Sequence, residues 1–342
     1  MKTTPQEVQV LAALNKLGAA PVQQLAECAG LKPHSVRYVL QSMVDRKAIE
    51  PVSAINMHAI GLKPYMLYFS IKAATPAEEE RAAQAAAAHQ NVSWVAELSG
   101  DYQFGMQVLA PSVPDALKII GEIRNSMAVT WFRKAFIEGL ELYVWPLKYF
   151  AKGELPANIL CYRSVPTLYE MDGLDHQILR AKAEDPYSGD AGIARACGAA
   201  VNTVTYRIKK MEDAGVITGH CYTPLWGKLQ LIQYKIVVNL RAIDAAVHAS
   251  LLDFARRSEY CIFALACVGA WDFEFNIFTS RADEERAFTG QLWREFGDYL
   301  DAVNIISYPR TIKRVEYPFK DESALFLGSR PSASPSEKRS AS

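Results

Sequence analysis

Residues 202–210 carry side chains that could read a nucleic acid from one face of a helix. Val204, Ile208 and Met211 recur at spacings of four and three residues, which is the pattern of a buried helical stripe. The polar residues between them then face outward: Asn202, Thr203, Thr205, Tyr206, Arg207, Lys209 and Lys210. Asparagine can pair with adenine and threonine can contact a thymine methyl group, whereas arginine and lysine bind phosphates. This set predicts a DNA-contacting helix, and an ordinary solvated face is the alternative.

An earlier segment shows a similar pattern with fewer basic groups. Val36, Leu40 and Met43 form the apolar stripe, so an outward set is expected of His34, Ser35, Arg37, Tyr38 and Gln41. Gln41-Ser42 stand where the later helix has Lys209-Lys210. DNA contact and a plain solvated face both remain open for this helix.

The remaining reactive residue types form no recognisable catalytic or metal site. The six cysteines include no Cys-x-x-Cys pair, and no histidine stands at metal-binding or catalytic spacing from a cysteine or carboxylate. We therefore expect free thiols, no cofactor and no metal. The first residues lack the apolar core of a signal peptide and no run could span a bilayer, so a cytoplasmic protein is expected. Because the formal net charge is zero, any DNA site must be a local patch.

The chain around these residues contains an internal repeat. Residues 24–49 align without a gap with residues 192–217, at an offset of 168. Seven pairs are identical, among them Gly30/Gly198 and Tyr38/Tyr206. The match continues at an offset of 169, where residues 100–104 correspond to residues 269–273. The chain is thus expected to contain one unit twice, over residues 1–150 and 171–320.

Each unit is expected to begin with three short helices. In the first unit they lie at about 5–17, at 22–29 and around Val36–Met43. In the second unit they lie at about 173–183, at 190–197 and around Val204–Met211. Gly30 or Gly198 allows the tight turn before the third helix, which is the helix-turn-helix pattern. Residues 48–52 and 216–220 read as wing strands. Strand and helix signals then follow in the order β-α-β-β-α-β, the ferredoxin-like plan.

The expected fold class is therefore α+β, with two winged helix-turn-helix domains alternating with two ferredoxin-like βαββαβ (RAM-type) domains. The expected domains are a first winged helix-turn-helix at 1–58, a first ferredoxin-like domain at 62–150 and a linker at 151–170. A second winged helix-turn-helix follows at 171–226 and a second ferredoxin-like domain at 230–320. The Ser- and Pro-rich residues 328–342 lack apolar side chains to bury and are expected to be a disordered tail.

This combination resembles the Lrp/AsnC (feast/famine) family of transcriptional regulators. Residues 202–217 look like that family's recognition helix and the turn into its wing, and residues 269–273 look like the turn between its second and third sheet strands. The resemblance implies a sequence-specific regulator that binds double-stranded DNA. It also implies a small effector such as an amino acid near that turn, which here means Gly269, Ala270, Trp271 and Asp272. A plain hairpin turn, with Asp272 capping its own backbone, is the alternative.

The first copy departs from the family pattern at two positions. Gln103 stands where the family has an Asp, and Lys47 stands where the second copy has Gly215. We therefore expect most DNA affinity from the second helix-turn-helix and one effector site in each chain.

Two other functions compete with this interpretation. Tandem units of this fold occur in siroheme decarboxylases, where His, Arg and Tyr side chains act on a tetrapyrrole. Residues 96–105 and 261–275, around the two equivalent turns, contain no His or Arg. For that reason we expect no enzyme. A ligand sensor that has lost DNA binding is the second alternative.

The alternation of side chains along the third strand of each sheet bears on assembly. One face carries Tyr102, Phe104 and Met106, or Trp271, Phe273 and Phe275, and we assign it to the helices. The opposite face is semi-polar, with Gln103 and Gln107, or Asp272, Glu274 and Asn276, and suits pairing with a second sheet around a small polar pocket. A homodimer or larger assembly is expected. Pairing of the two sheets within one chain is the less favoured alternative to pairing between chains.

Overall fold

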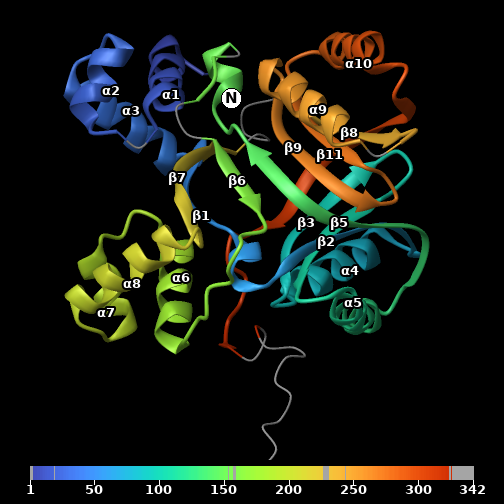
Figure 1. Cartoon of the computed structure of the whole chain (residues 1–342), viewed down its shortest axis with the longest axis horizontal. Helices are drawn as coiled ribbons and strands as arrows, with labels where there is room; N and C mark the ends of the chain where they lie inside the picture. The colour runs from blue at the N-terminus through green and yellow to red at the C-terminus, as the bar shows by residue number, and fades with distance from the viewer. Residues whose placement is uncertain are drawn as a thin grey trace, which may run out of the picture.

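The computed structural model describes residues 3–18, 20–152, 154–156, 159–225, 231–242, 244–322 and 325. It confirms the expected fold class, because three helices and a strand are followed by a β-α-β-β-α-β unit twice along the chain. The two helical heads lie on one side of the molecule and the two ferredoxin-like units on the other (Figure 1). The tail expected at 328–342 lies outside the described residues.

The first head consists of α1 (Pro5–Leu17), α2 (Val22–Ala29) and α3 (Pro33–Asp45), followed by β1 (Ile49–Ile55). A capping box between Thr4 and Glu7 starts α1, since it satisfies backbone N–H groups that have no partner in the helix. Gly30 has a φ of 66° and ends α2, so the turn requires the left-handed conformation expected there. Val36, Leu40 and Met43 are buried against the other two helices, as the stripe predicts.

The second head repeats this arrangement with α6 (Gly173–Glu184), α7 (Asp190–Cys197), α8 (Val201–Asp213) and β7 (Ile217–Pro224). The strands β1 and β7, which follow α3 and α8, do not form separate wings. β1 and β7 pair with each other in an antiparallel ladder that runs from Ile49 opposite Pro224 to Ile55 opposite Ile217. Backbone hydrogen bonds of this ladder therefore connect one head to the other.

The ferredoxin-like units have the same order of elements. The first contains β2 (Lys63–Lys72), α4 (Pro76–Ala88), β3 (Val92–Ser99), β4 (Phe104–Ala110), α5 (Val113–Met127) and β5 (Thr130–Val144). The second contains β8 (Ile232–Leu240), α9 (Ala245–Arg257), β9 (Cys261–Gly269), β10 (Phe273–Thr279), α10 (Ala282–Phe296) and β11 (Leu300–Arg314). Two short helices, η1 (Met57–Ile60) and η2 (Lys148–Ala151), and strand β6 (Leu160–Arg163) lie at the junctions.

The two four-stranded sheets join into one closed ring within the chain. The strand order is β2-β4-β3-β11-β8-β10-β9-β5, and β5 also pairs with β2. The long strand of each unit crosses to the other unit, since β11 pairs with β8 and then β3, and β5 pairs with β2 and then β9. Pairing within one chain, the alternative that we favoured less, is therefore the observed one. A homodimer stays a prediction that this structure does not test.

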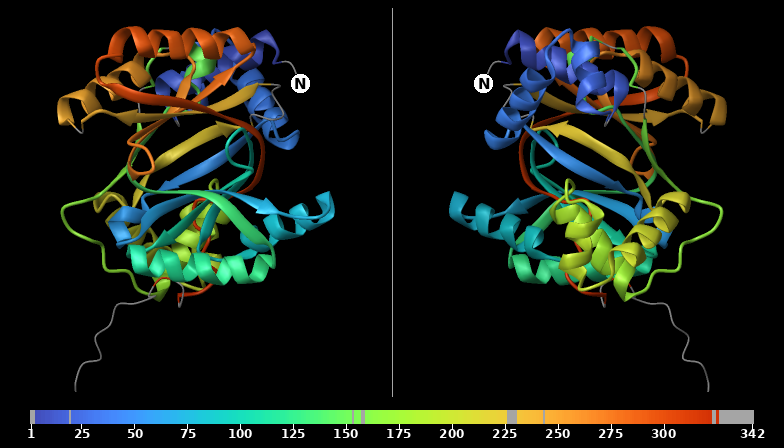
Figure 2. Two further views of the ribbon diagram at one scale, coloured as in Figure 1. Left: turned by 90° about the vertical axis from the view of Figure 1, so that its right-hand side faces the viewer. Right: turned by 90° about the vertical axis from the view of Figure 1, so that its left-hand side faces the viewer.

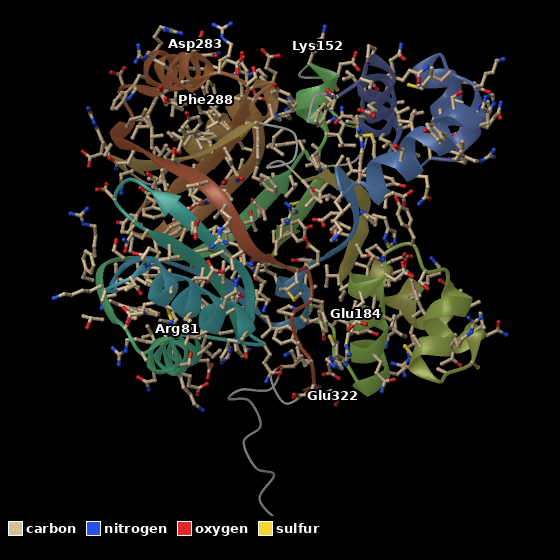
Figure 3. The ribbon with its side chains drawn as sticks, turned by 180° about the vertical axis from the view of Figure 1, so that it is seen from behind. Arg81, Lys152, Glu184, Asp283, Phe288 and Glu322 are labelled. Atoms are coloured by element: carbon tan, nitrogen blue, oxygen red, sulfur yellow. The ribbon has the colours of Figure 1, made fainter. Side chains whose placement is uncertain are left out.

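The helices cover the outside of the ring, and the strands meet in the middle (Figure 2). Phe273 and Phe275 pack against α9 and α10, and Phe104 and Met106 pack against α4 and α5, as the alternation predicts. In Figure 3 Phe288 lies on the sheet side of α10, whereas Asp283 lies on its outer side. Trp271 and Tyr102 are exceptions, because they precede β10 and β4 and pack in the cluster between the two sheets.

The segment expected as a linker, 151–170, contains β6, which adds to the ring beside β5. The amide of Tyr169 also donates to the carbonyl of Ala59. Among the helices of the described residues, none combines the length and the apolar character needed to cross a membrane.

Candidate functional site

A cavity of about 240 Å³ lies inside the ring, between the two sheets. Strands of both ferredoxin-like units line it, and so do β1 and β7 from the heads. Its apolar wall includes Met66, Leu142, Val144, Leu160 and Leu265. Its polar wall is made by Tyr68, Gln107, Lys235, Glu274, Asn276, Tyr308, Arg314 and Glu316. A pocket is therefore present between the semi-polar sheet faces as expected, but its lining is more apolar than polar.

Glu274 on β10 is the most buried acid of this wall. Its carboxylate has one ion-pair partner and two hydrogen-bond donors within the chain. It forms an ion pair with Lys235 on β8. The hydroxyl of Tyr68 donates to Glu274 at 2.7 Å and the indole N–H of Trp271 donates at 2.9 Å. Burial, followed by the charge of Glu274, raises the pKa of Tyr68 well above its ordinary value. Tyr68 comes from the first unit and the other three residues come from the second, so both repeats build this cluster.

The equivalent positions of the first unit, at the offset of 169, carry Met66 and Gly105 instead of Lys235 and Glu274. A Cβ on Gly105 would lie 2.6 Å from the ring of Trp94, which is closer than carbon atoms pack. The first unit therefore lacks the ion pair and uses the space for an indole ring. Of the two matched pairs of positions, only the one in the second unit holds a buried Lys–Glu ion pair.

Arg314, at the end of β11, forms a second polar group on the cavity wall. Its Nη1 donates to Thr223 Oγ1 on β7 at 3.4 Å, and its Nη2 lies 3.8 Å from Glu316. Its guanidinium lies over the ring of Phe263, 5.8 Å from the centroid. Burial raises the pKa of Glu316, although the charge of Arg314 opposes this shift and the nearby Glu50 adds to it.

His58 in η1 lines the same cavity. Burial lowers its pKa, and the charge of Lys63 lowers it further. Sequence reasoning missed His58, Lys235 and Arg314 as site residues. They belong to three segments far apart in the chain, and only the alternation along β4 and β10 indicated a pocket.

The turn expected to bind an effector is occupied by the chain itself. The amide of Ala270 donates to Phe136 of β5 at 3.1 Å, and Gly269 has a φ of 137° with no room for a Cβ. The backbone N–H of Leu240 donates to Asp272 Oδ2 at 2.8 Å. These contacts are those of a structural turn packed on the other sheet.

The first unit makes the matching contact with a different side chain. The backbone N–H of Ile71 donates to Gln103 Oε1 at 2.8 Å, and Ile71 and Gln103 correspond to Leu240 and Asp272 at the offset of 169. Gln103 and Asp272 thus perform the same structural task. The difference between Asp and Gln, from which we expected one effector site in each chain, does not separate the two turns.

On α8 most of the expected DNA-contacting residues are exposed: Asn202, Thr203, Thr205, Tyr206, Lys209 and Lys210. Arg207 is different, because its Nη1 lies 2.8 Å from Asp172 and 3.2 Å from the fully buried Asp175. The Nζ of Lys210 lies over the ring of Tyr169 at 5.1 Å. Arg207 therefore connects α8 to α6, and its guanidinium is occupied within the head.

On α3 the side chains of His34, Arg37, Tyr38 and Gln41 are exposed, and Ser35 is half-buried. Arg37 has no ion pair within the described part of the chain, whereas Gln41 donates to Asp45 at 2.7 Å. Residues 1–58 contain six Lys and Arg against four Asp and Glu, while residues 171–226 contain six against seven. The basic excess thus belongs to the first head, while the expected ranking of the two heads in DNA affinity stays a prediction.

Comparisons with known proteins give matches to one head, to one unit and to nearly the whole chain. A model of winged helix-turn-helix DNA-binding domains matches residues 171–218. A sequence search of curated proteins finds no match. The fold is similar to the crystal structure of the siroheme decarboxylase NirDL, with a TM-score of 0.59 and 11% identity over 94% of this chain and 96% of that chain. NirDL in co-complex with an iron-uroporphyrin III analogue gives a TM-score of 0.58 with the same identity and coverage.

A crystal structure of an AsnC family transcriptional regulator from Agrobacterium tumefaciens matches a single unit. It covers 42% of this chain and 94% of its own, with 19% identity and a TM-score of 0.38.

The full-length similarity to NirDL contradicts our expectation that this chain is no enzyme, since the similar protein is a decarboxylase. The reasoning failed because it examined only the segments around the two turns. His58 and Arg314 reach the cavity from η1 and β11, which lie outside those segments.

Proposed function

We propose that this chain is a DNA-binding regulator whose two heads respond to a small ligand in the cavity of the ring. One observation carries the proposal: the β1–β7 ladder that joins the heads is also a wall of the cavity. Val52 and Ile55 of β1 and Cys221 and Thr223 of β7 line it. A ligand that displaces this wall changes the relative position of the heads, because the same backbone belongs to both.

The contact between Arg314 and Thr223 supplies a direct link between the ring and the heads. Thr223 lies opposite Glu50 in the ladder, and the charge of Glu50 acts on Arg314. A ligand that engages Arg314 would weaken its contact with β7. An allosteric effect requires such a difference in contacts between two states of the protein.

The exposed faces of α3 and α8 support DNA as the partner of the heads. In a helix-turn-helix the second helix enters the major groove, and the second helix of each head presents its polar face to solvent. The winged helix-turn-helix match to residues 171–218 and the resemblance of residues 202–217 to Lrp/AsnC regulators agree with this. Arg207 is occupied, whereas Lys209 pairs only with the exposed Asp213 at 3.4 Å, a weak contact that a phosphate can replace. Arg37 and Lys209 are therefore our strongest candidates for phosphate contacts.

Fluorescence anisotropy with genomic DNA fragments over a series of salt concentrations tests DNA binding. We expect Arg37→Ala with Lys209→Ala to weaken binding to every fragment and to reduce the salt slope by about 0.9 for each lost phosphate contact. Arg81→Ala is the matched control, because Arg81 lies on α4, away from the heads (Figure 3). Equal losses in the control and the double variant, or no binding at low salt, would overturn the proposal.

A second candidate function is an enzyme that acts on a ligand in the same cavity. The buried pair of Lys235 and Glu274, with Tyr68 bonded to it, favours this function, because such groups can give or take a proton beside a bound substrate. The full-length similarity to NirDL gives a specific reaction to test.

Incubation with siroheme, followed by absorbance and mass spectrometry, tests this candidate. An enzyme of this kind would shift the absorbance band and yield a product that has lost carbon dioxide. Lys235→Met should reduce turnover, whereas Arg81→Ala should not. An unchanged spectrum together with unchanged substrate mass would rule out this reaction.

A further inference from the structure

The guanidinium of Arg314 faces the cavity with most of its hydrogen-bonding capacity unused. Its side chain keeps 32% of its surface accessible although it lines an interior cavity. Its contacts are one long hydrogen bond to Thr223 and a separation of 3.8 Å from Glu316. Arg310, on the same strand, lies 2.5 Å from both Glu80 and Glu97. Since arginine has five N–H donors in a planar fork, Arg314 has donors to offer a planar anion.

The two cavity acids leave N–H donors of this arginine available. Glu274 is engaged by Lys235, Tyr68 and Trp271. The carboxylate of Glu316 lies 3.8 Å from Arg314 Nη2, which is beyond hydrogen-bond distance. Arg314 therefore keeps N–H donors that a bound anion could engage.

Aromatic rings form one side of the surroundings of Arg314. The ring of Phe263 lies under its guanidinium, and the rings of Trp94 and Tyr308 stack nearby with centroids 5.8 Å apart and an interplanar angle of 9°. Leu160 and Val315 continue the apolar wall. A ligand held by Arg314 would place its remaining atoms against these side chains, and burial of apolar surface would contribute to its affinity.

We infer that the cavity binds a small carboxylic acid with a flat apolar body, whose carboxylate pairs with the Arg314 guanidinium and whose body packs between the two sheets. Arginine pairs with carboxylates through two parallel N–H···O bonds, which fixes orientation as well as energy. This inference rests on the cavity as the ligand site of the proposed function, but it does not require that the heads bind DNA.

Isothermal calorimetry on the full chain without DNA tests the ligand class. The probes are benzoate, phenylacetate and indole-3-acetate, each compared with its neutral amide. We expect at least one acid to bind about tenfold or more tightly than its amide, because only the acid can form a charged pair. Equal binding of acids and amides, or no binding of any acid, would overturn the inference. DNA anisotropy on the same protein is scored separately, so a failure of one proposal is distinguishable from a failure of the other.

Variants of three neighbouring side chains test the anchor. Arg314→Gln should weaken acid binding by about 10- to 100-fold, whereas Arg310→Gln on the same strand should leave it unchanged. Glu316→Gln should strengthen binding, since a competitor for the guanidinium is removed, and a purely structural role would not produce that gain. Thermal melts verify that each variant is folded. If Arg314→Gln fails to fold, weaker binding in Glu316→Gln would still contradict the inference.

Discussion

The two ferredoxin-like units share an element order but differ in what they place inside the ring. The second contributes Lys235 and Glu274, while the first has Met66 and Gly105 at the same positions. The missing side chain at Gly105 leaves room for Trp94, and Trp94 lies beside Lys235. The ring thus needs the buried ion pair from one unit only, and the other unit uses small or apolar residues at these positions to accommodate the indole ring.

The two heads show a similar contrast in how they use arginine. In both, an acid of the first helix is bound by an arginine of the same head: Glu7 by Arg46 at 2.6 Å and Asp175 by Arg207 at 3.2 Å. The arginines come from different positions, after α3 in one head and within α8 in the other. This internal pair removes a cation from the recognition face of the second head only.

The largest expected effect comes from making the second unit resemble the first. Lys235→Met should lower the free energy of unfolding by about 3–5 kcal/mol, because it leaves the charge of Glu274 buried without its partner. The double variant Lys235→Met with Glu274→Gln should recover most of that loss. Urea denaturation measures both. As a control, Arg310→Gln breaks an exposed pair and should cost about 1 kcal/mol or less. A small effect of Lys235→Met would show that water reaches Glu274.

The variants Arg207→Ala and Arg37→Ala test the different roles that we assign to arginine in the two heads. The first should lower the free energy of unfolding by about 2–3 kcal/mol, since the buried Asp175 loses a charged hydrogen-bond partner. The second should change stability by about 0.5 kcal/mol or less but weaken DNA binding. Thermal melts and anisotropy separate the two effects. If Arg207→Ala leaves stability unchanged and abolishes DNA binding, our assignment of the two arginines is reversed.

The raised pKa of Glu316 predicts a pH dependence of acid binding. As the pH falls through the raised pKa of Glu316, Glu316 gains a proton, the negative charge beside Arg314 disappears, and benzoate should bind up to about tenfold more tightly. Arg314, Glu50 and Tyr162 are the ionisable groups that act on Glu316. Calorimetry at several pH values measures the slope.

Glu316→Gln should abolish that slope. His58 also lines the cavity and would gain a positive charge on acidification, but its pKa is lowered by burial. A slope that persists in Glu316→Gln and disappears in His58→Gln would assign the pH dependence to His58 instead.

The smallest expected effect concerns the turn before β1 and β7. Lys47 has a φ of 55° and Gly215 has a φ of 71°, so a side chain occupies the left-handed region in the first head only. Lys47→Gly should raise the free energy of unfolding by about 1 kcal/mol or less, because the steric penalty exceeds the entropy cost of glycine by a small margin. Gly215→Ala should lower it by a similar amount, and denaturation experiments on both variants test this symmetry.

The local structure followed from the sequence by itself. The apolar spacing of Val204, Ile208 and Met211 places α8, and the alternation of Phe273, Glu274 and Phe275 assigns the two faces of β10. Both patterns are short-range, since the periods of a helix and a strand are set by backbone geometry within a few residues. The internal repeat then assigned the same elements to the first unit. The semi-polar face of the third sheet strand in each unit indicated a pocket between the sheets, and a cavity is present there.

Tertiary structure alone decided how the halves join and which residues meet. Pairing of β3 with β11 and of β5 with β9 depends on strands more than 100 residues apart, and no local period specifies such a partner. The same long-range closure brings Arg314 to Thr223 and Glu274 to Tyr68. It also occupies Arg207 with Asp175, a contact that composition and motif could not reveal. The sequence determined the elements and their buried faces, while the site arose from packing between them, because burial is a property of the whole assembly of elements.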